Sequence, residues 1–145
     1  MSAAGSAETC IQLETNLDDV TPEILGHVIE KLMASGALDA WIVPILMKKN
    51  RPGHQLCALV KEADAERFKE LLFSETGTFG IRVRRVERAV LERSFETRKT
   101  EFGVIRFKNG SYRGKTVSCK PEFEDCKAAA ERNGIPLQEL CRRLK

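Results

Sequence analysis

The chain has 145 residues, of which 42% are hydrophobic and 31% are charged, and its formal net charge is +3. This profile indicates a folded globular protein and excludes a disordered one, and so small a net charge gives no reason to expect nucleic-acid binding. No apolar run approaches the roughly 18 residues of a membrane span, so no membrane association is expected. Five cysteines, an odd number without a Cys-x-x-Cys pair, favour reduced thiols and a cytoplasmic location.

Three segments are expected along the chain. Residues 1–9 should form a flexible leader or a remnant of cloning, because Met1–Ala7 is rich in small residues and lacks the apolar region of a signal peptide. Residues 10–88 and 89–145 should form two subdomains, since the character of the sequence changes after Glu87. A leader of this kind is consistent with a piece of a longer protein.

The stretch from Glu14 to Glu23 combines a strand, a turn and a helix start. Apolar residues alternate with polar ones up to Asp18, which predicts a strand with one polar face. Thr21 then suits an N-cap and Pro22 the first helical position. The oxygen-bearing side chains at this junction are of the kind that Mg²⁺ or Mn²⁺ prefers, and they are Glu14, Asn16, Asp18 and Asp19. A solvated turn before a capped helix remains the alternative.

The elements that follow predict an α+β fold. An amphipathic helix is expected over residues 22–35, an apolar strand over 39–47, a second helix over 64–75 and a strand over 80–86. The strand over 39–47 should be covered on both faces, with Pro44 at an edge or bulge. The strand over 39–47 leads into a short basic turn, and a further strand is expected around residues 56–60. Because the turn is so short, these two strands should be antiparallel. The order βαββαβ indicates a ferredoxin-like arrangement, whose free sheet face would carry Glu14, Asn16, Asp18, Arg82 and Arg84.

The second subdomain is expected to contain a C-terminal β-hairpin and two short helices. Residues 90–100 read as extended, and Asn109-Gly110 predicts a type I′ turn between strands over 102–107 and 112–120. A helix should begin near Pro121 and end at Asn133-Gly134, and it should carry the apolar residues Phe123, Cys126, Ala129 and Ala130, with Cys126 at an inward position. A last helix should follow Pro136.

The basic turn is the second candidate site. Lys48, Lys49 and Arg51 could bind phosphate groups, and Gly53 would allow close approach of the backbone. The first two strands should run parallel, which would bring this turn to the same end of the sheet as Asp18 and Asp19. Cations beside metal-binding carboxylates are the parts of a metal–nucleotide site. The alternative for both the acidic turn and the basic turn is a solvated surface without function. For the basic strand near Arg82, the alternative is a charged sheet edge that resists pairing with another strand.

Several blocks of sequence resemble the LarC family. They are Glu14–Gly26, Gly36–Ala40, Met47–Gly53, Glu75–Arg82 and Lys120–Cys126, and they occur in the family's order. Asn50 stands where glycine is usual in the family's basic loop. The resemblance covers the family's C-terminal domain, without the longer, histidine-rich N-terminal part.

The resemblance implies a CTP-dependent nickel chelatase of the lyase class. That family inserts Ni²⁺ into a pyridinium bisthiocarboxylic acid mononucleotide, making the nickel-pincer cofactor of lactate racemase, with the help of Mg²⁺ or Mn²⁺. It implies that Asp18 and Asp19, with Glu14 and Asn16, hold the divalent ion. The triphosphate of CTP would be bound by Lys48, Lys49 and Arg51, with Arg82 and Lys120 as further candidates. No catalytic residue is assigned.

Two other interpretations stay open. A homo-oligomer is expected from the apolar second strand, and the domain could be a non-catalytic oligomerisation module of the same fold. An RNA-binding variant of the fold is disfavoured by the small net charge and the scarcity of aromatic residues.

Overall fold

The computed structural model describes residues 7–144, which form two compact units. The N-terminal unit comprises Glu8–Arg88, and the C-terminal unit begins at Ala89. Most of the leader expected over residues 1–9 lies outside the described residues, but Ala7 to Thr9 already belong to the first strand. Within residues 7–144, no helix is both long and apolar enough to cross a membrane. The five cysteines are all free thiols.

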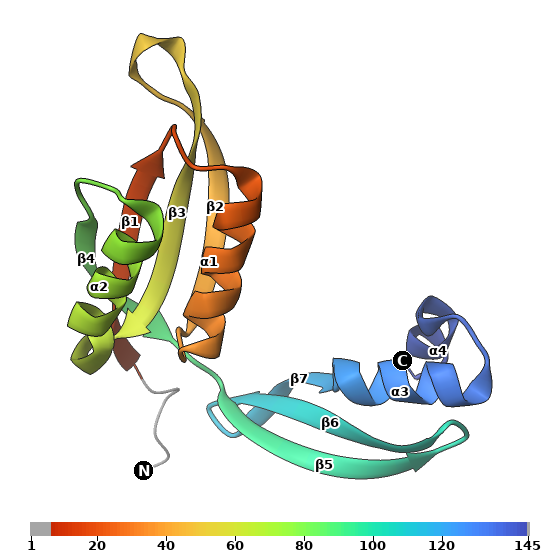
Figure 1. Cartoon of the computed structure of the whole chain (residues 1–145). Helices are drawn as coiled ribbons and strands as arrows, with labels where there is room; N and C mark the ends of the chain where they lie inside the picture. Colours follow the sequence, from red (N-terminus) through yellow and green to blue (C-terminus); the bar gives the residue numbers. More distant parts are fainter. Residues whose placement is uncertain (1–6, 145) are drawn as a thin grey trace. The chain divides into compact units, whose positions relative to one another are not determined.

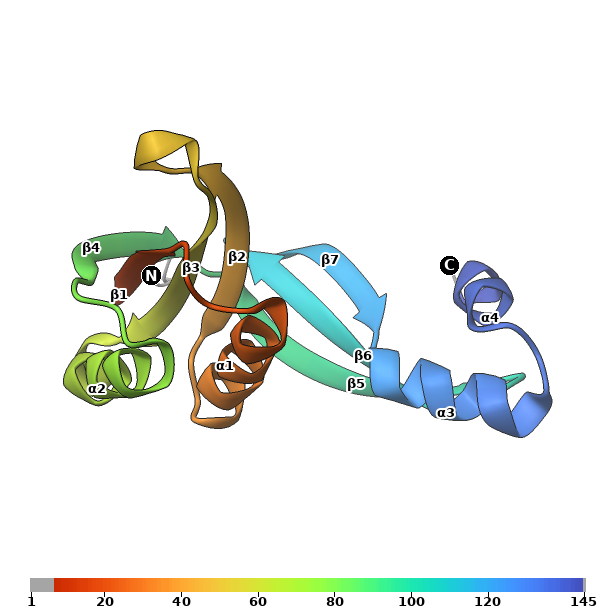
Figure 2. The ribbon, with the colours of Figure 1, turned by 45° about the horizontal axis from the view of Figure 1, so that its top comes forward.

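The N-terminal unit is a four-stranded sheet with two helices on one face (Figures 1 and 2). The strand order β2-β3-β1-β4 and the alternation of elements confirm the ferredoxin-like βαββαβ arrangement. The elements are β1 (Ala7–Leu17), α1 (Pro22–Ala34), β2 (Asp39–Leu46), β3 (Pro52–Lys61), α2 (Ala65–Thr76) and β4 (Arg82–Ala89).

Alternation in the central strands builds the core of this unit. Leu13 on β1 lies directly opposite Ala58 on β3, and both are fully buried beneath the helices. From α2, Phe68 and Leu72 enter the same core, and α1 contributes the stripe Leu25, Val28 and Leu32. Ile24 and Met33, at the margins of this stripe, are nearly half exposed.

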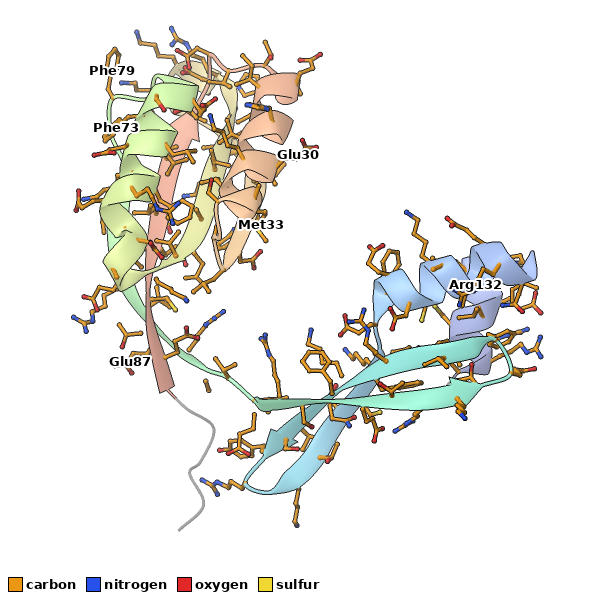
Figure 3. All side chains as sticks on the ribbon, turned by 60° about the horizontal axis from the view of Figure 1, so that its bottom comes forward. Glu30, Met33, Phe73, Phe79, Glu87 and Arg132 are labelled. Carbon is orange, nitrogen blue, oxygen red and sulfur yellow. The ribbon has the colours of Figure 1, made fainter. Side chains whose placement is uncertain are left out.

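Local chemistry fixes the helix ends. The hydroxyl of Thr21 accepts a hydrogen bond from the Ile24 amide, and Pro22 is the first residue of α1, as the sequence predicts. Helix α2 ends at Gly77, which has a φ of 64° that favours glycine. Phe79, in the connection to β4, is fully exposed (Figure 3).

Strand β2 differs from its prediction. It is an edge strand, in agreement with Pro44, but none of its residues is fully buried, so it is not covered on both faces. An apolar run such as Trp41–Met47 cannot by itself distinguish a doubly covered strand from a half-covered edge.

The C-terminal unit is a three-stranded antiparallel sheet followed by two helices (Figure 1). Its elements are β5 (Glu92–Thr100), β6 (Gly103–Tyr112), β7 (Lys115–Pro121), α3 (Phe123–Asn133) and α4 (Leu137–Arg143). Phe107 and Ile105 on β6 pack against Cys126, Ala129 and Leu140 of the helices. Cys126 is buried, as the sequence predicts, whereas Phe123 of the same helix is 61% exposed.

The turn of the predicted hairpin lies four residues later than expected. Asn109 and Gly110 are inside β6, and the turn is made by Arg113 and Gly114, whose φ values of 49° and 74° suit the two central positions. Gly110 serves packing instead, because a Cβ there would lie 2.7 Å from Cδ1 of Leu91.

Candidate functional site

Two chain segments meet at one end of the N-terminal sheet. Strands β1 and β2 each pair antiparallel with β3, so they run in the same direction and finish at the same edge. The loop between β2 and β3 stands beyond this edge (Figure 1). Nη1 of Arg51 in that loop donates a hydrogen bond of 3.0 Å to Oδ2 of Asp18, which directly follows β1. The acidic turn and the basic loop are therefore in contact.

The basic loop has a strained backbone. Its ends are joined by a hydrogen bond of 2.8 Å from the amide of Met47 to the carbonyl of Arg51. Between them Lys49 and Asn50 have φ values of 61° and 56°, in the left-handed region. Asparagine tolerates this conformation better than most residues, whereas lysine does not. The left-handed backbone explains why asparagine can replace glycine at position 50, and strain of this kind is typical of functional loops.

Gly53 brings the loop close to the end of β1. A Cβ at this position would lie 2.7 Å from the carbonyl oxygen of Leu17 and 2.6 Å from Sδ of Met47. The sequence predicts that Gly53 allows another group to approach the backbone closely. In the structure that group is the backbone of Leu17, immediately before Asp18. All three cations of the loop, Lys48, Lys49 and Arg51, are exposed.

The acidic residues are not assembled into one metal cage. Among the described residues, no three His, Cys, Asp or Glu side chains lie close enough to hold an ion together. Asp18 and Asp19 are both exposed at the turn, and one or two carboxylates are enough for Mg²⁺ when phosphate oxygens and water complete its shell. The donors present therefore fit an ion shared with a phosphate ligand, and they do not fit an ion held by protein alone.

Glu14 lies within a cluster of donors on the free face of the sheet. Its carboxylate accepts hydrogen bonds from Nε of Arg82 at 3.1 Å and from Gln12 at 2.6 Å, and Nη2 of Arg84 lies 3.7 Å away. Burial by itself would raise the pKa of Glu14, but the hydrogen bonds and the arginine charges outweigh burial and lower its pKa. Glu14 is thus an ionised carboxylate already paired within the chain.

The same cluster includes Asn16. Nη2 of Arg82 donates to its Oδ1 at 2.7 Å, so Arg82 bridges two of the predicted metal ligands. The placement of Glu14, Asn16, Arg82 and Arg84 on one face agrees with the sequence. The sequence does not predict their mutual pairing, because a shared face does not determine which side chains are in contact. Gln55, which donates to Glu14 at 3.4 Å, was also missed.

Lys120 belongs to the C-terminal unit. It is an exposed residue of β7 and lies directly opposite Lys108 on β6. The contacts of the N-terminal unit bring together Asp18 and Arg51, and separately Glu14, Asn16 and Arg82.

Comparison with known proteins gives a consistent result. The family model of nickel insertion proteins matches residues 1–141. The pyridinium-3,5-bisthiocarboxylic acid mononucleotide nickel insertion protein of Acetivibrio thermocellus is 46% identical over 133 residues, which are 92% of this chain and 32% of that protein. The chain spans about a third of the length of the curated relatives it matches.

Solved structures agree with the sequence relatives. LarC2, the C-terminal domain of a cyclometallase involved in the synthesis of the NPN cofactor of lactate racemase, in its apo form, is 34% identical, with a TM-score of 0.90 and 94% of each chain covered. A protein of Methanopyrus kandleri is 30% identical, with a TM-score of 0.68 over 94% of this chain and 85% of that one. The chain therefore belongs to the nickel insertion protein family and is similar over nearly its whole length to the C-terminal domain of LarC.

Proposed function

We propose that this domain binds CTP together with Mg²⁺ or Mn²⁺ and thereby serves the insertion of Ni²⁺ into a pyridinium-3,5-bisthiocarboxylic acid mononucleotide. The observation that carries the proposal is the contact between the acidic turn and the basic loop, through Asp18 and Arg51. Nickel is the cargo of the reaction, and the chain spans about a third of its relatives' length, so the complete insertion reaction is proposed for the longer protein.

In this proposal the acidic turn binds the metal ion and the basic loop binds the triphosphate. Asp18 and Asp19 would hold the divalent ion, which neutralises phosphate charge when it is bound. Lys48 and Lys49 would act as point charges for the triphosphate, and the planar guanidinium of Arg51 can bind a phosphate with two parallel hydrogen bonds.

Arg51 couples metal binding to phosphate binding. Its ion pair with Asp18 joins side chains that are 55% and 24% exposed, and pairs of this kind contribute only about 0–1 kcal/mol. A divalent ion can therefore displace Arg51 from Asp18 at little cost, and the released guanidinium is then free to bind phosphate. In this scheme the ion and the nucleotide favour each other's binding.

Removing the loop's charges tests the proposal. Replacing Lys48 and Lys49 by Ala should weaken CTP binding in the presence of Mn²⁺ about 100-fold or more, because each charged contact contributes roughly 1.5–3 kcal/mol. Calorimetric titration measures the affinity. The unfolding midpoint should stay unchanged, since both side chains are exposed.

A matched control removes two exposed lysines elsewhere, Lys61 and Lys127. This control has the same change in net charge and should bind CTP normally. Equal weakening in both double variants would show that only total charge matters, and a loss of stability in the Lys48 and Lys49 variant would make the loop structural.

A further inference from the structure

We infer that the outer face of the β5-β6-β7 sheet binds a mononucleotide with a pyridinium ring that carries acid groups. This inference rests on the proposed function, because it assigns a place to the class of substrate that the function requires. It concerns the C-terminal unit alone and is independent of the Asp18 and Arg51 site.

The strand register places five cations on this face. Arg93 lies opposite Gly110, Lys99 opposite Val104, and Lys108 opposite Phe95 on one side and Lys120 on the other. Directly opposed residues share a face, and so do residues two apart in one strand. Up to the irregularity of register between Gly110 and Ser111, the cations on this outer face are Arg93, Lys99, Arg106, Lys108 and Lys120.

The carboxylates of the strands lie on the other face of the sheet. Within β5, β6 and β7 no carboxylate shares the outer face, whereas the alternate residues of β5 include Glu92 and Glu96. Arg106 is bound by Asp125 of α3, and Nζ of Lys108 lies 3.9 Å from Glu122.

Three of these five cations have no ion-pair partner among the described residues. Within residues 7–144, no carboxylate forms an ion pair with Arg93, Lys99 or Lys120. Lys108 and Lys120 are directly opposed, and like charges directly opposite each other destabilise a sheet, so an anionic ligand would relieve the repulsion between these two.

Phe95 adds an aromatic surface to this face. Its side chain is 62% exposed, and it lies directly opposite Lys108, with Arg93 two residues before it on the same face. Opposed side chains in a sheet are about 5 Å apart and residues two apart in a strand about 7 Å. An exposed aromatic ring among lysines and arginines offers a flat surface on which a planar ligand can stack, with cations nearby to pair with its anionic groups.

The ligand class follows from these charges. A pyridinium ring is a flat cation, which stacks favourably on an aromatic face. Its acid substituents and its phosphate are anions, which pair with surrounding ammonium and guanidinium groups. A cationic ring bearing anions at its edge is complementary to Phe95 surrounded by Arg93, Lys108 and Lys120, whereas a simple phosphate would not use the ring.

Nicotinic acid mononucleotide is the probe, because it combines a pyridinium ring, a carboxylate and a phosphate. Titration of the whole chain should show binding, with CMP, which lacks the cationic ring, binding more weakly. Phe95→Ala should weaken binding of the probe at least about fivefold, as expected for loss of one stacked ring, and Lys108→Ala should weaken it as well.

Phe123→Ala is the matched control, since Phe123 is 61% exposed and lies outside these strands. It should bind the probe normally. Equal binding of the probe and CMP, or an unchanged affinity in Phe95→Ala, would overturn the inference. Failure of the probe to bind a chain that still binds CTP with Mn²⁺ would overturn it while leaving the proposed function intact, and Lys48→Ala should affect only CTP.

Discussion

A methyl group added at Gly53 tests how closely the basic loop approaches the end of β1. In the variant Gly53→Ala the new Cβ would lie 2.6 Å from Sδ of Met47 and 2.7 Å from the carbonyl oxygen of Leu17. The methionine side chain can rotate away, but the carbonyl belongs to a strand in the centre of the sheet. Overpacking of this kind costs about 1–3 kcal/mol. The loop must therefore move away from Asp18, or the strand end must shift.

The fluorescence of Trp41 measures this cost. The chain has a single tryptophan, and it lies on β2 in the N-terminal unit. For a loss of about 2 kcal/mol, the urea midpoint should fall by roughly 1 M. Affinity for CTP in the presence of Mn²⁺ should fall in the same variant, because Leu17 immediately precedes Asp18.

Gly26→Ala is the matched control. Gly26 is exposed within α1, nothing lies within 4 Å of a Cβ placed there, and alanine should stabilise the helix by about 0.5–1 kcal/mol. If Gly53→Ala were as stable as the parent chain and bound CTP equally well, the close approach of the loop would be refuted.

Two further predictions concern the C-terminal unit. Hydrogen bonds from Arg106 lower the pKa of Asp125 from its ordinary 3.8 to about 2. The ionised carboxylate therefore stabilises the unit fully at pH values above 3.8, and this stabilisation is lost as the pH falls towards 2. Asp125→Asn should lower the melting temperature near neutral pH and flatten its acid dependence in circular dichroism; an unchanged profile would contradict this. Gly114→Ala should cost about 1 kcal/mol in chemical denaturation, because φ is 74° there. Equal stability would place the turn elsewhere.

The sequence predicts the N-terminal fold well because its patterns are local. Alternation in β1, the capped start of α1 and the short basic loop each depend on neighbouring residues, and together they leave few topologies other than βαββαβ. The same alternation correctly places Glu14 and Arg82 on one face. Strand direction predicts that Asp18 and Arg51 lie at the same end of the sheet, and the structure adds the hydrogen bond between them.

Tertiary contacts decide the features that sequence reasoning misses. Asn109-Gly110 has the composition of a type I′ turn, yet Leu91 packs on Gly110 and the turn moves to Arg113-Gly114. Glu14 has the chemistry of a metal ligand, but its pairing with Arg82 depends on how the side chains on the free face are positioned across the strands. Neither the contact of Leu91 with Gly110 nor that of Arg82 with Glu14 can be predicted from local sequence.

Calorimetric titration of the chain with CTP, with and without Mn²⁺ and with ATP as the control, tests the central claim most directly. The account predicts binding that requires the metal ion and is selective for CTP. Failure of both nucleotides to bind, or equal binding of CTP and ATP without the metal ion, would contradict the assignment of a metal–nucleotide site to the acidic turn and the basic loop.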